Sequence, residues 1–155
     1  MDLKFRVGAR IAKPVAEVFE ALVNPGHLSH YFTTGGAKGQ LASGATVTRD
    51  FHDFPGAVPV QVVEVELNKR IVLRWGAQDD APDGEPQSPH DTTVTMTFEQ
   101  LDDGRTLVQI SEEGWRETPK GLKACLGNCE GWTGMLCAMK VWLEYGIHLR
   151  TDMYK

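Results

Sequence analysis

Glu112 is the residue whose type and position most clearly suggest chemistry. It follows Val108 and Ile110 at two-residue spacing in a segment predicted to be a strand, so its carboxylate should point into the interior with them. Desolvation disfavours a buried carboxylate, which therefore needs a partner or becomes neutral. Such a group can orient a ligand hydroxyl or act as a general acid or base. Two simpler interpretations stay open: Glu112 reaches water at the strand's end, or it pairs with a cation such as Arg49.

The histidines give weaker signals. His27 and His30 lie three residues apart on one face of a short predicted helix and are close enough to share a metal ion. No acid or cysteine stands at a matching spacing, so a solvated helix surface is the preferred interpretation. His52 beside Asp50 or Asp53 offers a general-base pair, but no serine or cysteine nucleophile accompanies it.

The three cysteines are interpreted as ordinary thiols. Cys125 and Cys129 share the buried face of a predicted helix, whereas Cys137 lies far around that helix, so one metal ion cannot be bound by all three. We expect the first two to pack as small apolar side chains and Cys137 to be exposed. Their odd number and close spacing also argue against a disulfide framework. Phosphate-loop, dinucleotide and metalloprotease motifs are absent from the sequence, which therefore predicts no metal site and no cofactor.

The hydrophobic pattern predicts the elements that position these residues. Alternating apolar residues predict strands over residues 3–11, 46–51, 58–67, 69–75, 92–101 and 106–112. Helical spacing predicts a helix that begins near Pro14 and stops at Asn24, a second short helix over residues 28–32, and a long helix over residues 119–147. Residues 78–91 contain three prolines, several acids and no large apolar residue, so we expect a long exposed loop. The predicted class is α+β, with one long helix covering a curved six-stranded antiparallel sheet.

Two faces of the long helix are distinctive. An apolar stripe predicted to face the sheet contains Cys125, Cys129, Trp132, Leu136, Met139, Leu143 and Ile147. A second face gathers small residues, namely Gly127, Gly131, Gly134 and Ala138. Glycine destabilises a helix interior, so a close neighbour is expected there. A strand of the same chain is the first interpretation, and a helix of a second subunit in a homodimer is the alternative.

Composition excludes several classes of protein. The 155 residues suit a single domain over residues 1–155, and 16 basic against 21 acidic residues give a net charge of −5. No basic cluster stands out, so nucleic-acid binding is not expected. No run approaches the ~20 apolar residues of a membrane-spanning helix, and the first residues show no secretory signal. We therefore expect a cytoplasmic protein that associates with neither nucleic acid nor membrane.

Four segments in order resemble a known superfamily. They are the run from Ile11 to Leu22 with Asn24-Pro25 and Leu28 to Phe32 after it, the run from Lys69 to Trp75, Glu113-Gly114-Trp115, and Gly131-Trp132 ahead of Leu143-Glu144-Tyr145-Gly146. Together they are similar to the START-like (SRPBCC, Bet v 1-like) helix-grip proteins, in the mostly bacterial branch named after the activator of the heat shock protein 90 ATPase. The resemblance spans essentially the whole chain. It implies a sheet gripping the C-terminal helix, with two short helices after the first strand and a cavity for an apolar molecule.

The resemblance also implies which residues would line that cavity. They are Phe19, Leu28, Tyr31, Phe32, Phe51, Trp75, Met96, Phe98, Glu112, Trp115, Trp132, Leu136, Met139 and Leu143. The alternative is that the apolar members of this set simply fill the core. Tyr31 stands where the branch usually has tryptophan, and Glu112 stands where many relatives have histidine. Both departures change the polarity of the predicted site.

Three functions remain in view. The first is binding of a small hydrophobic or aromatic molecule, such as a lipid, polyketide or flavonoid, with Glu112 and Tyr31 as polar contacts and without catalysis. The second is a polyketide cyclase or dehydratase that uses Glu112 for proton transfer. The third is activation of a chaperone ATPase, against which the chain's lack of the extra N-terminal domain of the eukaryotic activators is an argument. Fold alone does not choose among them.

Overall fold

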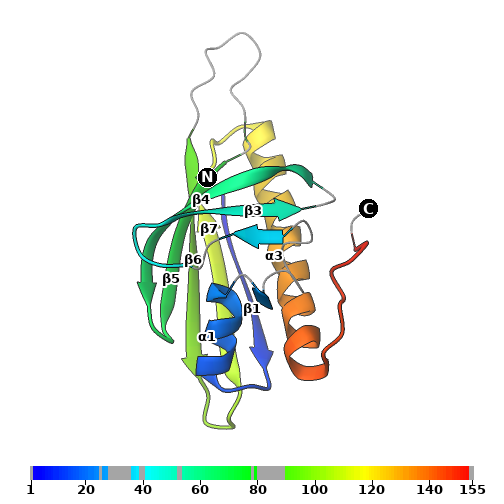
Figure 1. Ribbon diagram of the computed structural model, residues 1–155. Helices are drawn as coiled ribbons and strands as arrows, with labels where there is room; N and C mark the ends of the chain where they lie inside the picture. Colours follow the sequence, from blue (N-terminus) through cyan, green and yellow to red (C-terminus); the bar gives the residue numbers. More distant parts are fainter. Residues whose placement is uncertain are drawn as a thin grey trace.

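A computed structural model describes residues 2–24, 26–27, 36–38, 41–51, 54–77, 79 and 90–153. In chain order the elements are β1 (Lys4–Ile11), α1 (Val15–Val23), β2 (Gly36–Lys38), β3 (Thr46–Phe51), β4 (Phe54–Glu66), β5 (Arg70–Gly76), β6 (Asp91–Gln100), β7 (Thr106–Glu113) and α3 (Pro119–Tyr145). Figure 1 shows one curved sheet, with α3 beside its long strands and partly behind β3 and β4, and with α1 near its lower end. The predicted α+β helix-grip arrangement is confirmed.

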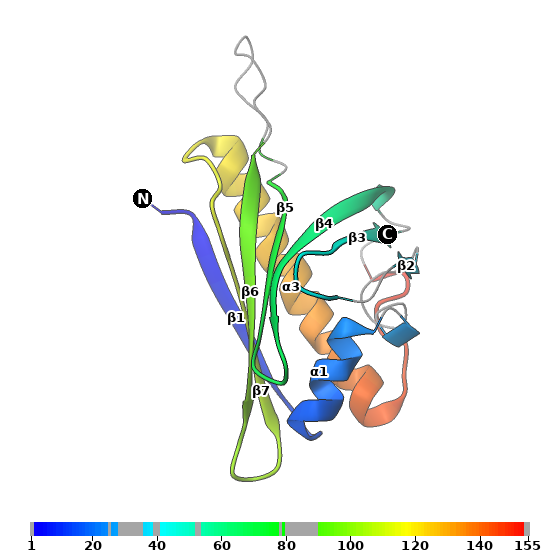
Figure 2. The same cartoon turned by 60° about the vertical axis from the view of Figure 1, so that its left-hand side comes forward.

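The sheet is antiparallel throughout, in the order β1-β7-β6-β5-β4-β3-β2. The six strands expected from the sequence are present, and the three-residue β2 adds a seventh among the described residues by pairing with β3. The sequence pattern did not predict β2, because such a short strand has no alternating apolar pattern. In Figure 2 the sheet curves around α3, from β1 and β7 toward β3 and β2.

The ends of α3 are defined by local chemistry. Thr118 Oγ1 accepts a hydrogen bond from the Gly121 backbone N–H at 3.0 Å. Pro119 is the first helical residue, where a backbone N–H would have no partner within the helix, so the missing N–H of proline costs nothing. Gly121 has to be glycine, because a Cβ there would lie 1.8 Å from the Arg116 carbonyl oxygen. Gly146 ends the helix in the left-handed conformation, with φ of 69°.

This termination corrects one prediction. Ile147 was expected on the buried stripe, but it lies beyond Gly146 and is 56% exposed. The apolar pattern continued past the residue that reverses the chain, and a periodicity argument does not detect that reversal. The rest of the stripe behaves as predicted at Cys125, Trp132, Leu136 and Met139, which are all buried.

The small-residue face of α3 also differs from expectation. A Cβ placed on Gly127 or Gly131 would meet no atom within 4 Å outside the helix's own backbone. No described strand therefore approaches the helix at Gly127 or Gly131, and the first interpretation is wrong at these two positions. The alternative of a second subunit stays a prediction.

The core lies between the sheet and the two helices. Alternate residues of β6 and β7 face inward, so Val94, Met96 and Phe98 are buried beside Val108 and Ile110. From α1, Phe19 meets Phe98 edge-to-face with ring centroids 5.2 Å apart. The backbone of α3 lies closest to β1 among the strands, so side chains bridge the wider distance to the middle of the sheet. Among the described residues, no helix is long and apolar enough to cross a membrane.

Candidate functional site

Glu112 lies at the centre of a buried polar cluster. Its exposed fraction is 0%, so the interpretation that it reaches water is wrong. Oε1 accepts hydrogen bonds from Trp132 Nε1 at 2.8 Å and Asn128 Nδ2 at 3.2 Å. Oε2 accepts from Thr92 Oγ1 at 2.6 Å, Trp75 Nε1 at 3.0 Å and Asn128 Nδ2 at 3.0 Å. Every partner among the residues that the structure describes is an uncharged donor. The side chain of Arg49, the cation considered above, lies outside the described residues.

Strand register and helix periodicity together assemble this cluster. On β7, the parity that buries Val108 and Ile110 also buries Glu112. On the neighbouring strands, Trp75 of β5 is paired with Thr92 of β6. On α3, Asn128 and Trp132 are one turn apart and face the same carboxylate. Glu112 therefore connects three adjacent strands to the helix.

The two indoles of the cluster also contact each other. Trp75 and Trp132 stack with centroids 5.4 Å apart and planes inclined by 30°. Their N–H groups donate to opposite oxygens of Glu112. An indole N–H cannot accept a hydrogen bond, so both rings require an acceptor at this point. The aromatic pair and the carboxylate thus position one another.

The predicted lining residues fall into three groups. A single core cluster contains Phe19, Met96, Phe98, Trp132, Leu136 and Met139, with Trp75 and Leu143 packed against it half-buried. Trp115 is buried in a separate cluster with Ala77 and Cys125, stacks on Phe5 and donates to the Ala77 carbonyl at 3.1 Å. Leu28, Tyr31 and Phe32, the second short helix predicted around them and the Phe51 side chain lie outside the described residues, as do His30, His52 and Asp53.

The thiol of Cys125 is affected by its burial and by the charge of Glu112. Burial raises the pKa of its thiol, with smaller contributions from Cys129 and the negative charge of Glu112. Cys137 is exposed, as predicted. The thiol most shielded from reagents is therefore the one beside the carboxylate.

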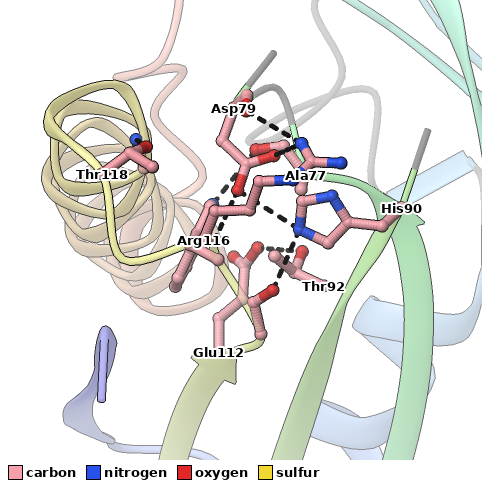
Figure 3. A network of polar contacts seen from close by, with 10 residues as sticks. Ala77, Asp79, His90, Thr92, Glu112, Arg116 and Thr118 are labelled. Carbon is pink, nitrogen blue, oxygen red and sulfur yellow. Dashed lines mark hydrogen bonds and ion pairs between the residues drawn. The ribbon is translucent and has the colours of Figure 1, made fainter. Parts of the chain in front are cut away.

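A second polar network lies next to the first. Asp79 is only 2% exposed, which corrects the expectation that the whole 78–91 segment is solvated. Its Oδ2 accepts from the Arg116 backbone N–H at 2.7 Å, and its Oδ1 contacts Arg116 Nη1 at 3.2 Å. His90 Nε2 lies 3.2 Å from Asp79 Oδ2 and 3.0 Å from the Gly114 carbonyl oxygen. Figure 3 shows Asp79 between Arg116 and His90, with Glu112 and Thr92 just below.

Sequence reasoning missed two members of the Glu112 cluster. Thr92 was recoverable, because it shares the parity of Val94 and Met96 on β6. Asn128 precedes Trp132 by one helical turn, which places it beside the apolar stripe. A polar residue at each of these positions was the available signal for a buried acceptor.

Comparisons with known proteins agree with this architecture. The family model described as "Activator of Hsp90 ATPase homolog 1-like protein" matches residues 12–144. Among solved structures, protein SSP2350 from Staphylococcus saprophyticus is 26% identical, with a TM-score of 0.73 and coverage of 97% of this chain and 96% of that one. The Aha1 dimer from Colwellia psychrerythraea is 21% identical, with a TM-score of 0.70 and coverage of 94% and 98%. DynU16, from the dynemicin biosynthetic locus, is 22% identical with a TM-score of 0.78, and the match covers 98% of this chain but 51% of DynU16. No curated protein matches the sequence significantly.

Proposed function

Because the chain belongs to the family of Activator of Hsp90 ATPase homolog 1-like proteins, we propose that it binds a small aromatic or hydrophobic molecule between α3 and the sheet. The observation behind this proposal is the pair of stacked tryptophans around a buried carboxylate, in the part of the interior where side chains bridge α3 and β5. Ligand sites in proteins are mainly apolar and aromatic, with a few polar groups that orient the ligand.

The predicted lining residues fit this role chemically. Trp75, Trp132 and Phe98 offer flat apolar surface, and Met96 and Met139 offer adaptable thioethers. DynU16, from the dynemicin biosynthetic locus, shares this fold. We extend the proposed site to Leu28, Tyr31, Phe32 and Phe51 by the family resemblance only.

Tryptophan fluorescence tests the proposal. The chain has four tryptophans, and an aromatic ligand beside Trp75 and Trp132 should quench them. We expect a panel of naphthalene, flavonoid and polyketide probes to include binders that raise the melting temperature and quench emission. Quenching should disappear in the W75F/W132F double variant. It should persist in W142F, since Trp142 contacts His148 beyond the end of α3. If no probe shifts the melting temperature, and native mass spectrometry of the purified protein finds no bound molecule, the proposal is wrong.

Proton transfer by Glu112 has less support. A carboxylate offers about four acceptor positions, and both oxygens of Glu112 are already engaged by four donors. Chaperone ATPase activation, the activity in the family's description, is the other alternative. A chaperone pull-down that is unaffected by the W75F/W132F substitutions would favour that alternative.

A further inference from the structure

We propose that the ligand at Glu112 is a neutral or cationic aromatic molecule carrying a hydrogen-bond donor, such as an amine or hydroxyl, and that anions such as fatty acids are rejected. This inference rests on the proposed function and adds the charge class of the ligand. It follows from the charge of the buried cluster and from the unequal strength of its hydrogen bonds.

The charge of Glu112 has no counter-ion among the described residues. Its partners are two indoles, a hydroxyl and an amide, all of which are neutral. Arg116, in the adjoining network, is held by Asp79 through its backbone N–H and its guanidinium. A second anion beside Glu112 would meet a like charge in a region shielded from water, where repulsion is weakly screened. An ammonium or hydroxyl group would instead be attracted.

Asn128 is the donor that such a group can replace. Its amide N–H bond is shared between both oxygens at 3.0 and 3.2 Å, whereas Thr92 and Trp132 donate at 2.6 and 2.8 Å. Asn128 is also half-buried, so its displaced amide can reach water. Thr92 and Trp132 are buried, and a displaced donor on either residue would stay away from water. A ligand amine that takes the place of Asn128 would keep Glu112 fully hydrogen-bonded through a charge-assisted bond.

A matched series of probes on one ring system tests the inference. The probes are 2-naphthylmethylamine, 2-naphthalenemethanol, 2-methylnaphthalene and 2-naphthoate, measured by titration calorimetry at neutral pH and low salt. We expect the amine and the alcohol to bind at least about tenfold more tightly than the naphthoate, which is the scale of one charge-assisted hydrogen bond. Equal or tighter binding of naphthoate would overturn the inference while leaving the proposed function intact. If none of the four binds, including the uncharged methylnaphthalene, both are contradicted.

Two variants connect the preference to its cause. In Glu112→Gln the difference between amine and naphthoate should fall below about threefold. In Asn128→Ala no donor has to be displaced, so the amine should bind about threefold or more tightly than to the wild type. Methylnaphthalene carries no donor, so its binding should tighten less than that of the amine in Asn128→Ala. Circular dichroism checks that each variant is folded, and if Glu112→Gln is not, the Asn128→Ala titrations still decide. An unchanged amine preference in folded Glu112→Gln, or weaker amine binding in Asn128→Ala, would contradict the assignment.

Discussion

Replacing Glu112 should reveal how strongly its hydrogen bonds stabilise the fold. Glu112→Leu removes the acceptor for four donors at once. Trp132 Nε1 and Thr92 Oγ1 belong to buried residues and would lose their hydrogen bonds to Glu112 away from water, at a cost of about 1–3 kcal/mol each. Trp75 and Asn128 are partly exposed, so water can compensate them. Removing the buried charge offsets part of this combined loss, and we expect a net destabilisation of about 2–4 kcal/mol.

Glu112→Gln should cost less, for a reason specific to this cluster. The amide oxygen can still accept from Trp132 and Asn128, and the Thr92 hydroxyl can rotate to accept from the new amide N–H. The Trp75 N–H is left facing another donor, and Asn128 keeps only its longer contact, to the remaining oxygen. We expect a loss of about 1–3 kcal/mol, which is still a large fraction of the about 5–15 kcal/mol that stabilises a typical domain.

Urea unfolding followed by far-ultraviolet circular dichroism measures both variants. Glu113→Gln is the matched control, because Glu113 follows Glu112 on the same strand but is exposed, so its substitution should change stability by less than about 0.5 kcal/mol. Thr92→Val removes a single donor and should cost about 1 kcal/mol. The reasoning is refuted if Glu112→Leu is as stable as wild type, or if Glu112→Gln is no less stable than Glu113→Gln.

Three further predictions concern other parts of the chain. Maleimide at neutral pH should label exposed Cys137 quickly and Cys125 slowly, because burial raises the pKa of the Cys125 thiol and lowers its thiolate fraction. Peptide mass spectrometry after timed quenching measures the two labelling rates, and equal rates would contradict the prediction. Asp79→Asn should destabilise by about 1–3 kcal/mol in urea, because Arg116 and His90 lose a buried charged acceptor, and an unchanged midpoint would argue against the network. Gly127→Ala should stabilise the folded protein by about 0.5–1 kcal/mol through helix propensity, since no described atom outside the helix's own backbone lies within 4 Å of the added Cβ. A lower melting temperature together with a smaller mass in light scattering would instead indicate that a second subunit covers this face.

Strand parity made much of the fold and the orientation of Glu112 predictable. Period-two patterns are local, so the alternation in β7 placed Glu112 on the buried side without knowledge of any neighbour. Helical spacing similarly predicted that Trp132 and Met139 would face the sheet. The error at Ile147 arose because the apolar period continues past a glycine that reverses the chain.

The partners of Glu112 were not predictable in the same way. Trp75, Thr92 and Asn128 lie 37, 20 and 16 positions away in sequence. Whether they reach one carboxylate depends on the register of β5, β6 and β7 and on the rotation of α3. Those quantities are set by the packing of the whole core, and no window of sequence contains them. The pattern indicated that Glu112 needed partners but did not identify them.

The choice of neutral partners links the stability of Glu112 to its proposed binding role. An arginine partner would satisfy the carboxylate equally well and would cancel its charge. Indole, hydroxyl and amide donors satisfy the oxygens and leave the negative charge in place, where it acts on Cys125 and on any ligand nearby. Thr92 and Trp132 hold that charge in a buried position, while Asn128 occupies the position that a ligand donor would take. Stability and ligand preference should therefore separate by residue: substitutions of Thr92 should act mainly on unfolding, and substitutions of Asn128 mainly on which probes bind.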